Sequence, residues 1–226
     1  MQNPLDHTLL KRPKIIHSAT FRHLIILCLD GGGSMQALAP EKITKADSVS
    51  SAIRDLFSIM KSSWIGVNYS FAIVNYDHRA KVIMPPTATK DIDDKDNRQY
   101  DPTLGFGGAQ FISEGLMKAQ ELAEQFLAQS TPGGLSYSVT ILIISDGGDM
   151  NHSKTVELAQ QLKEKNGIQI AGCLVETLGA DQEELQSRSE YVKGLCSEER
   201  LFTNELDSEV LRNFIYLDSF PNVGIL

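Results

Sequence analysis

The chain has 226 residues, 42% of them hydrophobic, which is enough to build one large domain with an ordinary core. Its formal net charge of −8 argues against a nucleic-acid partner, because binding phosphates requires clustered lysine and arginine. No apolar run approaches the ~20 residues of a membrane span, and the first residues lack the pattern of a secretory signal, so no membrane partner is expected.

The predicted elements begin after a polar, partly basic stretch, residues 1–20, which is interpreted as an N-terminal arm. Residues 24–29 are continuously apolar and end at Asp30, which is typical of a strand buried on both faces. Pro40 suits the first turn of the next helix, whose apolar residues recur every three or four positions, from Ile43 as far as Met60.

Strands and helices alternate through the rest of the chain. The predicted elements are a hairpin of strands over 67–76 and 80–84, helices over 111–129, 153–165, 181–196 and 208–216, and strands over 139–144, 168–175 and near 201–202. This alternation predicts a Rossmann-like, three-layer α/β/α domain, whose central sheet has about six mostly parallel strands and one antiparallel edge strand. The domain is expected to span residues 21–217, followed by a C-terminal tail over 218–226.

The three cysteines, Cys28, Cys173 and Cys196, lack the regular spacing of a disulfide framework. Cys28 and Cys173 lie inside apolar runs and are interpreted as buried free thiols. Free thiols favour a reducing compartment, so the sequence predicts a cytoplasmic protein.

Two of the predicted strands end in an aspartate followed by glycines. The first reads Asp30-Gly31-Gly32-Gly33-Ser34, and the second reads Asp146-Gly147-Gly148. In sheets of this type ligands bind at the carboxyl ends of the strands. Two carboxylates at one edge of a sheet are a candidate site for a hard cation, which prefers oxygen ligands.

The order of these elements and motifs resembles the von Willebrand factor A (vWA) domain. That family carries a metal-ion-dependent adhesion site made of D-x-S-x-S, a later G-G-T segment and an Asp-Gly pair. The counterparts in this chain are Asp30 to Ser34, the segment that starts at Gly107-Gly108, and Asp146-Gly147. The resemblance covers about residues 23–217, and it implies that Asp30, Ser34 and Asp146 are metal ligands.

The chain departs from the family motif at two positions. Gly32 replaces the first serine, and the threonine position is Ala109 if counted from the glycine pair or Gln110 if counted back from Gly115. None of these residues offers a hydroxyl, although a Gln110 carbonyl could substitute in part. Magnesium demands near-ideal octahedral oxygen geometry, so we expect magnesium binding to be weak or absent.

The resemblance implies a non-enzymatic protein–protein interaction module, a scaffold within an intracellular assembly. In the family, a carboxylate from the partner protein often completes the metal's coordination. Asp30 and Asp146 are expected to have few positive neighbours. Without a cation, their repulsion should then raise the pKa of at least one of them, and removing either charge could stabilise the fold.

Two other readings compete with this interpretation. The segments Asp30 to Gly33 and Asp146 to Gly148 also resemble loops of patatin-like lipid acyl hydrolases, but the G-x-S-x-G nucleophile motif is missing between residues 35 and 145. A phosphate-binding loop at Gly31 to Gly33 would need the lysine of the P-loop motif, which is also missing.

Overall fold

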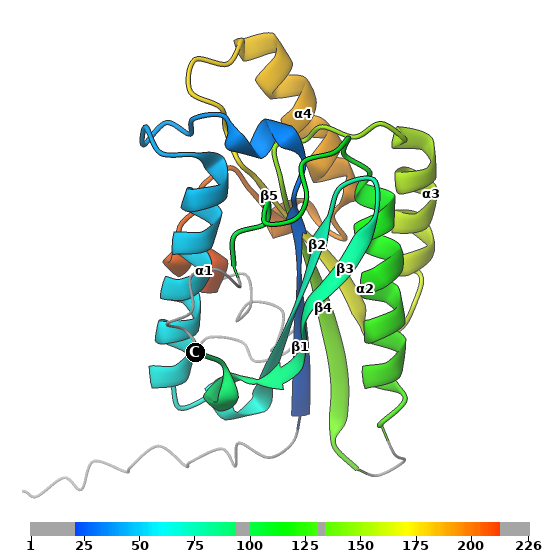
Figure 1. Ribbon diagram of the computed structural model, residues 1–226. Coiled ribbons are helices and arrows are strands. Elements are labelled where there is room, and N and C mark those ends of the chain that lie inside the picture. The colour runs from blue at the N-terminus through cyan, green and yellow to red at the C-terminus, as the bar shows by residue number, and fades with distance from the viewer. Residues whose placement is uncertain (1–20, 94–99, 131–133, 213–226) are drawn as a thin grey trace, which may run out of the picture.

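A six-stranded sheet with strand order β3-β2-β1-β4-β5-β6 forms the centre of the computed structural model, which describes residues 21–93, 100–130 and 134–212 (Figure 1). All neighbouring strands are parallel except β2 and β3, which pair antiparallel at one edge. The strands are β1 (Phe21–Asp30), β2 (Tyr69–Tyr76), β3 (Ala80–Ala88), β4 (Ser136–Ser145), β5 (Ile168–Leu174) and β6 (Phe202–Thr203). The predicted three-layer fold with one antiparallel edge strand is therefore confirmed.

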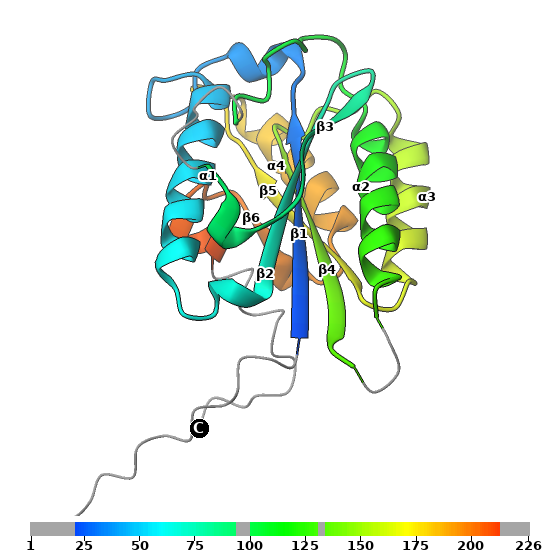
Figure 2. The same ribbon diagram turned by 60° about the horizontal axis from the view of Figure 1, so that its bottom comes forward.

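Helices cover both faces of the sheet. The α-helices are α1 (Lys45–Ser62), α2 (Ile112–Leu127), α3 (His152–Lys163) and α4 (Gln182–Leu195). The short 3-10 helices are η1 (Gly33–Gln36), η2 (Gly66–Asn68), η3 (Thr89–Asp91) and η5 (Glu199–Leu201). Figure 2 shows α1 on one side of the sheet and α2 with α3 on the other. Within the described residues, no helix combines the length and apolar character needed to cross a membrane.

The side chains of β1 alternate between two cores. Ile25, Leu27 and Leu29 pack in the core that contains the apolar face of α1. Leu24, Ile26 and Cys28 pack in the core formed with α2, α3 and the end of α4. Because both faces of β1 are buried, the strand is apolar at every position from 24 to 29, and it carries Asp30 rigidly at its end.

Two predicted boundaries were wrong. Helix α1 begins at Lys45 and not at Pro40, because the Thr44 side chain caps it by accepting a hydrogen bond from the Asp47 backbone nitrogen at 3.0 Å. Ile43 therefore lies outside the apolar face of that helix and is exposed. Strand β3 continues through Pro85 and Pro86, which an edge strand tolerates because one of its sides needs no hydrogen-bond donors.

The predicted ends of the chain lie largely outside the described residues. The arm over 1–20 and the tail over 218–226 are not among them, and only residues 208–212 of the predicted last helix are described, all of them helical. The proposed limits of the domain at residues 21 and 217 therefore stay predictions.

Candidate functional site

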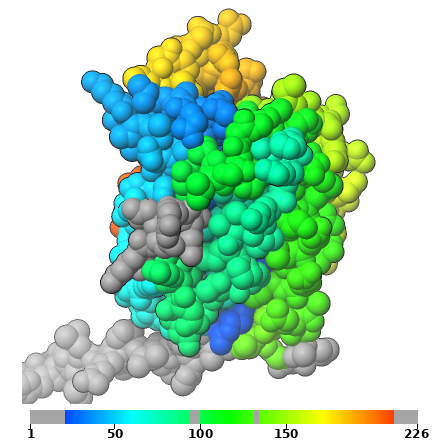
Figure 3. All heavy atoms as spheres, in the orientation of Figure 1, coloured from blue at the N-terminus to red at the C-terminus, as the bar shows by residue number. Residues whose placement is uncertain are grey.

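Three connecting segments meet at the edge of the sheet where the parallel strands end. Since β1 and β4 are adjacent and parallel, Asp30 and Asp146 lie side by side at this edge. The segment that leads into α2 lies next to them, and the Gly33 backbone nitrogen donates to the Gly108 carbonyl at 3.3 Å. In Figure 3 the segment after β1 (blue) and the segment before α2 (green) adjoin in the upper half of the molecule, below the yellow and orange spheres at its top.

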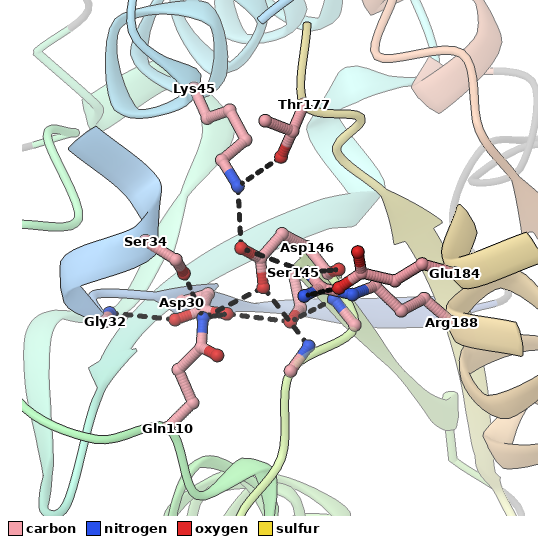
Figure 4. A network of polar contacts seen from close by, with 12 residues as sticks. Asp30, Gly32, Ser34, Lys45, Gln110, Ser145, Asp146, Thr177, Glu184 and Arg188 are labelled. Atoms are coloured by element: carbon pink, nitrogen blue, oxygen red, sulfur yellow. Dashed lines mark hydrogen bonds and ion pairs between the residues drawn. The ribbon is translucent and has the colours of Figure 1, made fainter. Parts of the chain in front are cut away.

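The Gln110 side chain lies at the centre of the predicted ligand set. Its amide nitrogen Nε2 is 2.8 Å from Asp30 Oδ2, 2.7 Å from Ser34 Oγ and 2.9 Å from Asp146 Oδ1 (Figure 4). The structure therefore brings together all three predicted ligands. It also resolves the alternative between the two counts, because Gln110 points into the site and Ala109 is exposed.

The Gln110 carbonyl does not face the three predicted ligands in this structure; its amide nitrogen does. Two carboxylates and a hydroxyl surround the end of this side chain, and of its two polar atoms only the amide nitrogen can donate to a carboxylate oxygen. The carbonyl oxygen instead lies against Gly148, where an added Cβ would come within 1.9 Å of Oε1.

Glycines on both sides leave room for Gln110. A Cβ at Gly32 would lie 2.3 Å from the Gln110 Cγ, well inside any normal contact. At Gly147 the backbone has φ +82°, a conformation that favours glycine, and this turn lets the Gly148 nitrogen donate to Asp146 Oδ1 at 3.1 Å. The Asp-Gly-Gly and Asp-Gly-Gly-Gly motifs therefore serve to seat Gln110 between the two aspartates.

Lys45, in the first turn of α1, is the most buried charged group at the site that the sequence did not indicate; Ser145 and Arg188 were not indicated either. Its Nζ lies 2.6 Å from Asp146 Oδ2 and 2.9 Å from Thr177 Oγ1, and the side chains of Lys45 and Asp146 are each only 1% exposed. Arg188 adds a second positive group, with Nη1 3.6 Å from Asp146 Oδ2. The expectation of few positive neighbours was therefore wrong at Asp146.

The two carboxyl groups have opposite pKa shifts. Burial, followed by the charge of Asp146, raises the pKa of Asp30 to about 7. Burial also opposes ionisation of Asp146, but the charge and hydrogen bond of Lys45 outweigh it and lower the pKa of Asp146 to about 2. The expectation that one of the two pKa values is raised is met at Asp30, with burial as the larger cause.

The donors around these carboxylates do not suit a magnesium ion. Asp30 Oδ1 accepts from the Gly32 nitrogen at 2.8 Å, and Asp30 Oδ2 accepts from Ser145 Oγ at 2.7 Å as well as from Gln110. With Gly148 and Gln110 on one oxygen of Asp146 and Lys45 on the other, every carboxylate oxygen already has a donor from the protein. Among the described residues, no group of three or more His, Cys, Asp or Glu side chains could hold a metal ion.

Comparisons with known proteins identify structures of similar fold but no relative by sequence. No family model and no curated protein matches the sequence. Among solved structures, the chain is similar to the conserved hypothetical protein BatB from Bacteroides thetaiotaomicron, with a TM-score of 0.60 and 16% identity over 85% of this chain and 98% of that one. The vWF domain of the type V pili tip protein Mfa5 from Porphyromonas gingivalis gives a TM-score of 0.59 and 13% identity over 92% and 97% of the two chains.

A third similar structure is the pilus adhesin SpaC from Lactobacillus rhamnosus GG, with a TM-score of 0.65 and 11% identity over 88% of this chain. This chain spans only 30% of the SpaC chain. Together with the sheet topology, these similarities show that the chain has the fold of a vWA domain. None of the three structures is described as an enzyme, so they lend no support to the patatin-like alternative.

The prediction of a cytoplasmic protein was wrong. The similar structures include pilus adhesins, pilins and an aerotolerance-related membrane protein, whose names point to the cell surface and contradict it. The physical reason is that buried cysteines say little about the compartment in which a protein resides. All three are buried, and burial raises the pKa of each thiol, which makes it unreactive in any compartment.

Proposed function

We propose that the chain is a non-enzymatic protein-interaction module that binds its partner at the sheet edge around Asp30, Ser34 and Asp146. The observation that carries this proposal is a set of four exposed apolar side chains in the connecting segments at this edge of the sheet. We call this set the edge surface; its members are Leu38, Leu104, Met150 and Leu178.

The members of the edge surface come from four separate segments of the chain. Their exposed fractions are 47% for Leu38, 58% for Leu104, 71% for Met150 and 45% for Leu178. Two of the segments are joined to each other, because Leu178 donates its backbone N–H to the Leu38 carbonyl at 2.8 Å, and a third is joined to the site, because the Met150 N–H donates to the Gln110 carbonyl at 2.8 Å. Exposed apolar side chains on several segments at one edge of a domain are typical of a protein-binding surface.

The chemistry of the site supports binding over catalysis. Asp30 and Asp146 are buried and engaged with donors from the protein, and the sequence offers no G-x-S-x-G serine for an acyl hydrolase. The adhesins and pilins of similar fold are named for attachment or assembly and not for a reaction. The partner of this chain is proposed to be another protein, of unknown identity.

The proposal is tested by capturing partners from an extract of the source cells on the immobilised chain. We expect a protein whose affinity falls at least about tenfold in Leu104→Asp and Met150→Asp, because a charge there disrupts an apolar contact. Trp64→Asp is the matched control, since Trp64 is 72% exposed but lies between α1 and the start of β2, at the end of the sheet where the parallel strands begin. Partners that bind all three variants equally would contradict the proposed surface.

A further inference from the structure

We infer that the Lys45 ammonium and the Gln110 carboxamide together take the place of a divalent cation, so that this edge of the sheet is held together without metal. The inference stands on the geometry of the site and holds whether or not the edge surface binds a protein. It implies that a partner's carboxylate would meet no metal ion here.

The position of the Gln110 amide nitrogen is the first argument. It lies within 2.7–2.9 Å of one oxygen each from Asp30, Ser34 and Asp146, the same three residues that would coordinate an ion. These are hydrogen-bond lengths, whereas magnesium requires oxygen ligands at about 2.0–2.1 Å. An ion could reach these oxygens only if the Gln110 side chain left the site.

The charge on Lys45 is the second argument. Lys45 lies 2.6 Å from Asp146 Oδ2, while Gln110 binds the other oxygen of the same carboxylate. A cation bound in place of the amide would therefore lie close to a buried ammonium group, and like charges in a buried site repel strongly. Lys45 supplies beside Asp146 the positive charge that a metal ion would otherwise bring.

The two departures from the family motif form the third argument, because they depend on each other. A side chain at position 32 would collide with Gln110, since a Cβ there would come within 2.3 Å of Cγ. Serine at position 32 is therefore incompatible with the conformation in which the Gln110 side chain fills the site. Glycine at position 32 and glutamine at position 110 therefore act together, because the glycine leaves the space that the amide fills.

Manganese titration, followed by electron paramagnetic resonance and thermal melting, tests the inference. The native chain should show no saturable binding and no change in melting temperature up to millimolar manganese. The triple variant Lys45→Met, Gly32→Ser, Gln110→Thr removes the ammonium and the carboxamide that replace the cation. It also introduces the two hydroxyls of the family motif. Losing even a supporting partner of a metal ligand costs roughly 10–100-fold in affinity, so restoring two ligands should raise manganese affinity at least about tenfold.

Two results would overturn the inference. One is a native chain whose melting temperature rises with manganese, with the rise abolished by Asp30→Asn. The other is a triple variant that binds manganese no better than the native chain. If the triple variant does not fold, the double variant Gly32→Ser, Gln110→Thr replaces it, while the native titration with its Asp30→Asn control is decisive by itself. No partner protein is needed, so failure here is separate from failure of the proposed function.

Discussion

Replacing Lys45 with methionine should lower the free energy of unfolding by about 3–5 kcal/mol, the usual cost of removing one partner from a buried ion pair. The substitution keeps an unbranched side chain of similar length but leaves the Asp146 carboxylate, which is 2% exposed, without its nearest positive charge. Urea denaturation of both chains at neutral pH measures the difference.

A surface lysine provides the matched control. Lys118 pairs with Glu121 on the exposed side of α2, and Lys118→Met should cost no more than about 1 kcal/mol. A Lys45→Met chain as stable as this control would show that Lys45 does not neutralise Asp146. The same reasoning reverses one expectation from the sequence, because removing the Asp146 charge should now destabilise the fold by leaving Lys45 buried and unpaired.

The second large effect is a loss of stability in acid caused by His23. This side chain of β1 is buried, with its ring nitrogens 2.7 Å from Ser138 Oγ and 3.0 Å from Thr140 Oγ1 on β4 and its ring 5.6 Å from that of Tyr69 on β2. Burial lowers the pKa of His23 from 6.5 to about 4. The folded chain therefore keeps the neutral imidazole at a pH where the unfolded chain has already taken up a proton.

The sign of the effect follows from proton linkage. Between pH 6.5 and about 4 the unfolded chain binds more protons at this residue, so stability is complete above pH 6.5 and falls as the pH falls towards 4. The pKa difference corresponds to a loss of about 3 kcal/mol. Urea denaturation at several pH values should show the stability advantage of the native chain over His23→Gln shrinking across this range. A constant difference would contradict the prediction.

The positions of the two aspartates in the fold follow directly from the sequence pattern. Residues 24–29 and 139–144 are apolar throughout because both faces of β1 and β4 are buried, and this pattern suffices to predict that Asp30 and Asp146 share one edge of the sheet. The motif also identified Ser34, which lies with the two aspartates around Gln110.

The contacts of Lys45 and Gln110 with the two aspartates could not be predicted from the sequence. Lys45 follows the cap residue of α1, and a lysine in the first turn of a helix is ordinarily solvated, so no local pattern shows that this one reaches Asp146. The orientation of Gln110 depends on contacts with residues 80 and 36 positions away along the chain. Counting along the motif left Ala109 and Gln110 as equal alternatives, and only the packing against Gly32 and Gly148 decides between them.

A crystal structure of the native chain grown in millimolar manganese, with anomalous diffraction recorded for that metal, tests the central claim most directly. We predict no anomalous peak at the sheet edge, with the Gln110 amide nitrogen in contact with Asp30, Ser34 and Asp146 and with Lys45 paired to Asp146. A manganese peak between Asp30 and Asp146, with the Gln110 side chain turned out of the site, would contradict the account.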